Sequence, residues 1–370
     1  MIPFLDKKLR VHFPKALFWV TFSLSVVGLI NLHSATYNIT TGKVSPLFIS
    51  QILWFTIGFL IAFLCLLVDY RILISFAYPA YFVSVVLLLL VVFFGKEVAG
   101  NKNWLVIGPL TMQPSELAKL AFIIALARYL ADHPAPIEGY NWFQMTRPVL
   151  LLLPPLIFIL LGKDIGSSLF LIATFGTLLL FSGVRKNVIL LSLLIGITGS
   201  VGAYQKMSGH QRGRIEAFIH PDEDPKGRGY HLLQSKIAVG SGKFFGKGYL
   251  KGMHNKLLYL PEKHTDFIFP VLSEEWGFLG SVVVLGLYLA ILIMGVQLAS
   301  KAKERFGIFL SLGVTALFFW QIVINLGGVL GLLPLTGVTL PLLSYGGSSL
   351  LMVMIGISLL MNISMRRFMF

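Results

Sequence analysis

Residues 72–94 read ILISFAYPAYFVSVVLLLLVVFF, a run without a single charged side chain. A helix needs roughly 20 mostly apolar residues to cross a bilayer, and this run is long enough. Similar stretches recur along the chain, and together they lie at about 16–35, 46–68, 72–94, 114–131, 148–162, 165–183, 187–205, 267–299, 306–330 and 346–364. The sequence therefore predicts an all-α integral membrane protein with about ten transmembrane helices, in a single polytopic domain over residues 1–370.

The composition supports this class. Of the 370 residues, 56% are hydrophobic and 12% are charged, whereas an ordinary soluble domain carries about 25% charged residues. A soluble enzyme, a disordered chain and a disulfide scaffold are excluded. The only cysteine, Cys65, excludes a disulfide or a multi-cysteine metal site within the chain.

The basic residues predict the orientation. An even number of spans places both termini on one side, and fourteen Lys and Arg then lie in the segments on that side, against four in the short loops opposite. The positive-inside rule therefore predicts cytoplasmic termini. The net charge of +14 is spread over loops at both faces, which favours a charged membrane surface over nucleic acid as a partner.

Two spans depart from the simple pattern. The fifth, at 148–162, is short and contains Pro154 and Pro155, so we expect it to be kinked or to cross only partly. The eighth is too long for a straight span. We expect its start, which contains Glu274 and Glu275, to lie outside the hydrocarbon or to face a cavity.

A long external loop is predicted at about 206–266. It carries eleven Lys and Arg, and long loops of this kind are usually functional. We expect short helices and turns, with a break at 221–225 and an amphipathic helix over 230–239. Its basic side chains suit an anionic headgroup, and non-specific attraction to anionic lipid is the alternative; they are Arg212, Arg214, Lys236, Lys243, Lys247 and Lys251.

Asp266 is the candidate catalytic residue at the end of this loop, where the apolar pattern resumes. One interpretation is that Thr265 or Asp266 caps the following helix. The other is a general base, since a carboxylate beside Phe267 and Phe269 can accept a hydroxyl proton. The residues alone leave both open.

Other polar residues lie at or between the apolar runs. Glu116 and Lys119 are three apart and share a helix face, as an ion pair or as groups facing a polar cavity. Asp164 lies in a short external turn, either solvated or functional. The uncharged segment 331–349 predicts a non-helical stretch lining a cavity, with hydroxyls for a sugar or phosphate on Ser344, Tyr345 and Ser348.

These features suggest two functions. The basic loop and the external carboxylate suit transfer chemistry on a phosphorylated lipid at the outer face. The intramembrane charged residues equally suit a transporter that relays protons or binds a substrate.

Three motifs, in order, carry a resemblance: QPSELAK at 113–119, DEDPKGRGYHLLQSKIAVGSG with GKG and LPEKHTDFIF between 220 and 269, and LPLLSYGGSS at 340–349. The chain resembles the SEDS family (shape, elongation, division and sporulation) over nearly its whole length. The motifs GYHLLQSKIAVGSG and GKGYLKG, together with the short N-terminal tail, are more similar to the RodA branch of elongation enzymes than to the FtsW branch of division enzymes.

The resemblance implies a peptidoglycan glycosyltransferase of the bacterial cytoplasmic membrane that polymerises lipid II, together with a class B penicillin-binding protein and the elongation machinery. Asp266 would be the base that deprotonates the acceptor hydroxyl, and Arg214 would neutralise the leaving pyrophosphate. Glu116 and Lys119 would line the central cavity. A divalent cation, Mg²⁺ or Mn²⁺, at the pyrophosphate is chemically reasonable, although no ligand cluster marks its site.

The chain departs from the family pattern at three places. Lys163-Asp164 stands in the position of Pro-Asp, which leaves the role of Asp164 open. Asn103 stands where Arg is usual, and Lys243 where Gly is usual.

Two alternative functions stay open. One is a lipid flippase or transporter, and the other is a non-catalytic scaffold.

Overall fold

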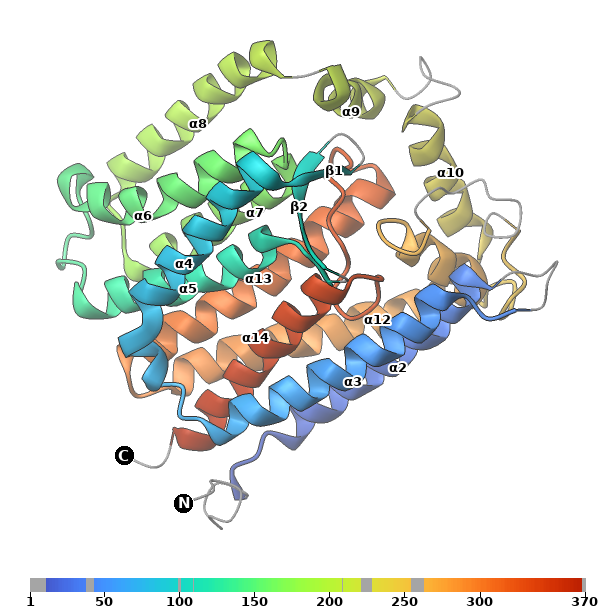
Figure 1. Ribbon diagram of the computed structural model, residues 1–370, viewed down its shortest axis with the longest axis horizontal. Helices are drawn as coiled ribbons and strands as arrows, with labels where there is room; N and C mark the ends of the chain where they lie inside the picture. The colour runs from blue at the N-terminus through green and yellow to red at the C-terminus, as the bar shows by residue number, and fades with distance from the viewer. Residues whose placement is uncertain are drawn as a thin grey trace. The chain divides into compact units, whose positions relative to one another are not determined.

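The computed structural model describes residues 11–37, 43–98, 101–108, 110–207, 209–220, 228–253 and 263–367 (Figure 1). Helices dominate, and each of the ten apolar stretches forms one. They are α2 (Lys15–Thr36), α3 (Pro46–Leu67), α4 (Ile72–Phe94), α5 (Pro114–Asp132), α6 (Trp142–Leu161), α7 (Ile165–Ser182), α8 (Lys186–Lys206), α12 (Ile268–Lys301), α13 (Arg305–Leu330) and α14 (Gly347–Arg366). The predicted helical membrane architecture is confirmed.

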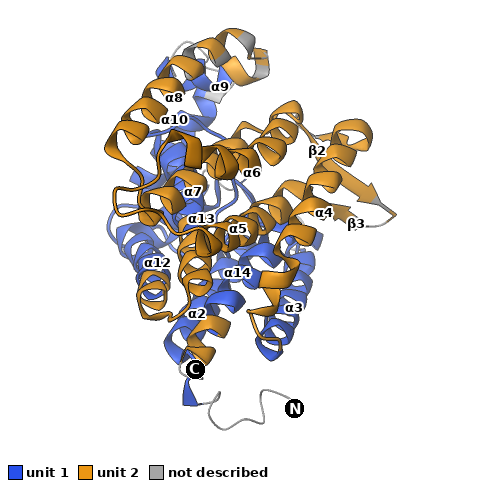
Figure 2. Ribbon diagram, turned by 90° about the vertical axis from the view of Figure 1, so that its left-hand side faces the viewer, with its two compact units in different colours: residues 1–67, 213–294, 318–361 blue, residues 68–212, 295–317, 362–370 orange. Residues whose placement is uncertain are grey.

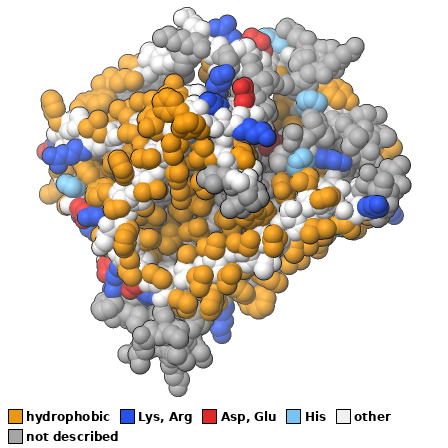
Figure 3. All heavy atoms as spheres, viewed as in Figure 1, with side chains coloured by type: hydrophobic (Ala, Val, Ile, Leu, Met, Phe, Trp, Pro, Cys, Tyr) orange, Lys and Arg blue, Asp and Glu red, His pale blue; other side chains and the backbone are white. Residues whose placement is uncertain are grey.

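Eight of these helices are long and apolar enough to cross a membrane: α2, α3, α4, α6, α7, α12, α13 and α14. The other two helices are α5 and α8. Helix α5 carries several charged side chains, and the apolar part of α8 is the shorter segment Lys186–Gly199. Hydrophobic side chains predominate on the visible surface of α2 and α3, as expected for helices in contact with lipid (Figure 3).

The expectation for the fifth span was wrong in its length. Helix α6 starts at Trp142 rather than near residue 148 and runs for 20 residues through all three of its prolines. A capping box sets this start: the amide of Gln144 donates to Asn141 Oδ1, and the Gln144 side chain accepts from the Asn141 amide, each at 3.0 Å. The span is about 30 Å long at 1.5 Å per residue.

The eighth span is interrupted, as its length predicts. Gly277 has φ 67° and ψ −162° inside α12, a conformation that glycine adopts without a steric penalty. The section before it contains Glu274 and Glu275, which are 0% and 2% exposed. These carboxylates therefore lie in a separate, protein-lined section and not within the continuous apolar helix.

A small antiparallel sheet was not predicted. Strands β1 (Lys96–Val98), β2 (Asn101–Ile107) and β3 (Leu110–Met112) pair in the order β1-β2-β3 between α4 and α5. The ammonium of Lys102 donates to the carbonyls of Val92 (2.8 Å) and Phe93 (3.1 Å). This contact fixes the sheet to the end of α4, where the last carbonyls of a helix need donors.

The long loop contains helices α9 (Gly209–Ile219) and α10 (Arg228–Ser241). Helix α10 confirms the amphipathic helix predicted over 230–239. The predicted break at 221–225 lies outside the described residues. Segment 331–346 is non-helical, as predicted.

The chain divides into two compact units (Figure 2). Unit 1 comprises residues 1–67, 213–294 and 318–361, and unit 2 comprises residues 68–212, 295–317 and 362–370. The single-domain assignment for residues 1–370 stays a prediction.

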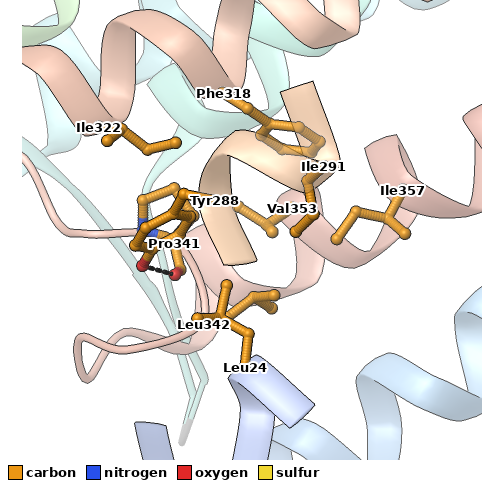
Figure 4. A pocket seen from close by; sticks show the side chains of 9 residues that line it. All are labelled: Leu24, Tyr288, Ile291, Phe318, Ile322, Pro341, Leu342, Val353 and Ile357. Atoms are coloured by element: carbon orange, nitrogen blue, oxygen red, sulfur yellow. Dashed lines mark hydrogen bonds between the residues drawn. The ribbon is translucent and has the colours of Figure 1, made fainter. Parts of the chain in front are cut away.

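Within unit 1, segment 331–346 packs into the helical core. The hydroxyl of Tyr288 donates to the carbonyl of Pro341 at 2.6 Å, and the side-chain amide of Gln51 donates to the carbonyl of Ser344 at 3.2 Å. Beside this segment lies a small apolar pocket (Figure 4), lined by Leu24, Tyr288, Ile291, Phe318, Ile322, Pro341, Leu342, Val353 and Ile357. Residues 340–344 of this segment are thus buried in the core, although they lack regular structure.

Candidate functional site

Asp266 lies in the turn that leads into α12, two residues before the first helical residue, Ile268. Phe267 therefore holds the position immediately before the helix, where the capping interpretation required Thr265 or Asp266. Asp266 is partly exposed, while Phe267 is buried beside it. The carboxylate thus stands at the boundary between an apolar core and an accessible surface.

Three contacts fix the backbone of this turn. The hydroxyl of Ser344 donates to the carbonyl of Thr265 at 2.7 Å, and the amide of Tyr345 donates to the carbonyl of His264 at 2.8 Å. The side-chain amide of Asn325, on α13, donates to the carbonyl of Asp266 at 3.2 Å. The backbone from which the Asp266 side chain extends is therefore held by residues 59 to 81 positions further along the chain.

Asp266 and Arg214 both lie beside Gly337. Arg214, on α9, donates from Nη1 to the carbonyl of Thr336 at 3.0 Å. A methyl group built at Gly337 would lie 3.6 Å from Asp266 Oδ2 and 3.7 Å from Arg214 Nη1. A carboxylate and a guanidinium therefore flank one glycine, which has φ +75° and offers no side chain to fill the space.

Arg214 also lines a small apolar pocket. Its other lining residues are Ala217 and Phe218 of α9, Leu232 of α10 and Leu335. Lys263 precedes Asp266 by three residues. Burial lowers the pKa of its ammonium, because an apolar surrounding disfavours the charged form. The site thus offers one carboxylate, one fixed guanidinium and apolar walls.

Two of the three residues proposed as hydroxyl ligands, Ser344 and Tyr345, have different positions. The Ser344 hydroxyl is 4% exposed and is used inside the protein, since it donates to Thr265 and accepts from the amide of Leu340 at 2.8 Å. Tyr345 is partly exposed and its ring lies 6.0 Å from that of His264. Ser344 therefore acts on the site through the turn that it holds.

Two other basic residues of the loop, Lys247 and Arg212, have partners of their own. Lys247 pairs with the fully buried Glu274 at 2.6 Å, while Lys243 is exposed. Arg212 lies two residues from Arg214 on α9, yet it donates to the carbonyl of Tyr204 at 3.2 Å at the end of α8. Arg214, like Asp266, lies beside Gly337.

In unit 2, Glu116 and Lys119 form an ion pair of 2.7 Å on α5, with side chains 11% and 5% exposed. The ammonium of Lys119 also lies 4.7 Å above the ring of Phe170. The predicted pairing is therefore observed, in a nearly dry environment where an opposite charge is needed to offset desolvation.

This environment predicts a strong coupling between the two residues. Removing one partner alone, by Glu116→Gln or Lys119→Met, is expected to lower the free energy of unfolding by about 3–5 kcal/mol, and the double variant should lose less than either. The more exposed pair Arg128–Asp132 on the same helix, at 3.5 Å with side chains 27% and 51% exposed, is the control and should couple by less than about 1 kcal/mol. Thermal unfolding in detergent measures both cycles; an additive result for the buried pair would contradict the interpretation.

Asp164 is a buried helix cap and not a solvated turn. Its carboxylate is 7% exposed and accepts from the amide (3.0 Å) and hydroxyl (2.9 Å) of Ser167 at the start of α7. It also accepts from the side-chain amides of Asn103 (3.2 Å) and Gln113 (3.3 Å). Asp164 thereby ties β2 and the residue before α5 to α7, and Asn103 is one of the donors it uses.

No three His, Cys, Asp or Glu side chains are grouped to hold a metal ion in the part of the chain that the structure describes. The cation expected at the pyrophosphate therefore has no ligand cluster there, and no step of the mechanism below uses one.

Comparison with known proteins identifies the family. The family model of FtsW, RodA and SpoVE, described as "Cell cycle protein", matches residues 15–368. The peptidoglycan glycosyltransferase MrdB of Escherichia coli (strain K12) is 37% identical over 289 residues, which cover 78% of this chain and 77% of MrdB. Stage V sporulation protein E of Bacillus subtilis (strain 168) is 34% identical over 351 residues, covering 93% of this chain and 95% of that protein.

Solved structures that are similar to this chain agree with the family match. A chain from a peptidoglycan synthase complex that coordinates polymerization and crosslinking has a TM-score of 0.82 at 33% identity, covering 96% of this chain and 98% of that chain. The rod shape determining protein RodA of Thermus thermophilus has a TM-score of 0.72 at 30% identity, with the same coverage. The chain therefore belongs to the FtsW/RodA/SpoVE family, which is the SEDS family that its motifs resemble.

Proposed function

We propose that this multi-pass membrane protein is a peptidoglycan glycosyltransferase that polymerises lipid II into glycan strands during cell elongation. The names of its relatives support the glycosyltransferase activity. We further propose that it lies in the bacterial cytoplasmic membrane with both termini in the cytoplasm, which the distribution of Lys and Arg supports.

The observation that carries the mechanism is that the Asp266 carboxylate and the Arg214 guanidinium both lie beside Gly337. The Asp266 carboxylate takes the proton from the acceptor's 4-hydroxyl, and that oxygen bonds to the anomeric carbon of the donor sugar. The bond from this carbon to the pyrophosphate breaks on the opposite face, so the configuration inverts. Arg214 stabilises the additional negative charge that develops on the departing pyrophosphate by charge-assisted hydrogen bonds.

Gly337 supplies the room for this reaction. The Gly337→Ala variant would place a methyl group against both Asp266 and Arg214 at a positive φ, and we expect at least a tenfold loss of polymerisation together with a stability cost of about 1 kcal/mol. Gly286→Ala on α12 is the control, because its added methyl meets open space. Equal activity of the two variants in a glycan-chain assay would contradict the role of Gly337.

In unit 2 we propose that Glu116, Lys119 and Asp164 shape the binding of substrate. Ionisable groups at membrane depth are usually functional. Asp164 accepts a hydrogen bond from the side chain of Gln113, the residue directly before α5. Tyr345, Arg212, Lys243 and Lys247 remain proposed as contacts of the substrate, although the ion pair of Lys247 limits its reach. Ser344 is a positioning residue in this proposal.

A class B penicillin-binding protein is the proposed partner. The similarity to a chain of a complex that coordinates polymerization and crosslinking supports an assembly of this kind. Other components of the elongation machinery, and Mg²⁺ or Mn²⁺ at the pyrophosphate, are proposed on chemical grounds only.

The test is polymerisation of labelled lipid II by the purified protein with its cognate partner. Glycan ladders are expected, and they should disappear when lipid II is omitted. A flippase, the alternative function, would instead move labelled lipid II across vesicles without making glycan. Transport without polymer, under conditions in which a known polymerase is active, would overturn the proposal.

A further inference from the structure

A glycine-rich hairpin at 242–248 is not explained by the transfer chemistry. Its sequence is GKFFGKG, and two of its side chains point away from the protein: Phe244 is 53% exposed and Phe245 is 78% exposed. Large apolar side chains at such exposure in a short loop usually mark an interaction surface.

Backbone hydrogen bonds seat this hairpin on the interruption of α12. The amide of Phe278 donates to the carbonyl of Lys243 at 2.8 Å, and the amide of Leu279 donates to the carbonyl of Phe244 at 3.1 Å. In the other direction, the amide of Lys247 donates to the carbonyl of Glu274 at 3.0 Å. The hairpin thus takes up amides and carbonyls that the break at Gly277 leaves without helical partners.

The approach is close enough to require glycine. A methyl group at Gly242 would lie 1.9 Å from the carbonyl oxygen of Ser273. The ion pair between Lys247 and the buried Glu274 holds the other end of the hairpin. The position of Phe244 and Phe245 relative to α12 is therefore fixed by backbone contacts.

The length of α12 places the hairpin relative to the membrane. From Phe278 to Lys301 the helix rises about 36 Å at 1.5 Å per residue, which is enough to cross a hydrocarbon core of about 30 Å without the section before Gly277. The start of the spanning section, to which the hairpin is bonded, therefore lies at the boundary between lipid and water.

The apolar surface of the hairpin continues directly onto the lipid-facing side of this helix. The ring of Phe244 lies 5.8 Å from that of Phe278, and the first turns of the spanning section expose Phe278, Leu279, Val282 and Val283. Lys243 and Lys251 are exposed nearby, as suits the phosphate groups at a bilayer surface.

We propose that hairpin 242–248 is a membrane anchor, which inserts Phe244 and Phe245 into the phospholipid bilayer at the head of the spanning section of α12. The exposed Lys243 would stay at the level of the headgroups. The anchor would hold the interruption at Gly277 at the membrane surface, and with it the section of α12 that leads to Asp266.

Site-directed spin labelling tests this depth. In a Cys65→Ser background, nitroxide labels are placed by Phe245→Cys, by Lys251→Cys as the aqueous control and by Val283→Cys as the lipid control. The protein is reconstituted in vesicles of phosphatidylcholine and phosphatidylglycerol, and the accessibility of each label to oxygen and to a water-soluble nickel complex is measured. We expect the label at 245 to favour oxygen several-fold, as at 283, while the label at 251 favours nickel.

Two results would overturn the proposal. A label at 245 that is as accessible to nickel as the label at 251 would place the hairpin in water. A label at 245 that is inaccessible to both reagents would indicate a protein contact, such as a second copy of the chain. The labels at 251 and 283 report folding, since an unfolded chain would not keep their opposite preferences.

Discussion

Asp266→Asn is expected to abolish polymerisation of lipid II, with a loss of about 10²–10⁴-fold in rate. The amide keeps the size of the side chain but cannot accept the proton of the attacking hydroxyl. The turn itself should survive, because it is held through backbone carbonyls by Ser344 and Asn325. The measurement is the rate of glycan-chain formation by the variant with its partner.

The control is the same chemical change at an exposed position, Asp132→Asn, whose carboxylate is half exposed at the end of α5. It should retain the activity of the unaltered protein. Thermal unfolding of both variants separates loss of the base from loss of fold. A stable Asp266→Asn protein that still makes glycan would show that Asp266 is not the base.

Arg214→Gln is expected to lower the polymerisation rate by about 10²–10³-fold, the usual effect of removing one preorganised donor at a developing charge. The guanidinium is already oriented by the carbonyl of Thr336 at 3.0 Å, so little reorganisation is needed when the pyrophosphate departs. The loss should fall on kcat more than on KM, because the charge on the leaving group grows in the transition state.

Lys251→Gln serves as the matched control, since it removes one positive charge from the same loop at an exposed position. If both variants lowered activity equally, the effect would come from the overall charge of the loop rather than from the position of Arg214. Arg214→Lys should recover only part of the activity, because an ammonium cannot bind phosphate oxygens in a bidentate manner.

The sequence alone could predict the helices because each depends on local composition. Uncharged runs of about 20 residues have no other stable place than a bilayer, where the backbone must satisfy its own hydrogen bonds. The starts of α4 and α7 are therefore predicted to the residue. The start of α6 was missed because its capping box, Asn141 with Gln144, lies in a polar stretch before the apolar run.

The candidate site was predicted in its residue types but not in its arrangement. Asp266 and the ion pair of Glu116 with Lys119 follow from local patterns and from the family motifs. The small sheet between α4 and α5 escaped prediction because its strands are short and are held by pairing and by Lys102, which a local pattern does not reveal.

The sequence by itself determined that this chain is a polytopic helical membrane protein with a carboxylate at the head of one span, since hydrophobicity and motif identity are properties of neighbouring residues. Only the tertiary structure decided that Arg214 and Asp266 lie beside the same glycine, Gly337, and that Lys247 forms an ion pair with the buried Glu274. These choices depend on which distant segments approach one another, and a positive φ at Gly337 or a carbonyl at Thr336 acts only after the chain has folded.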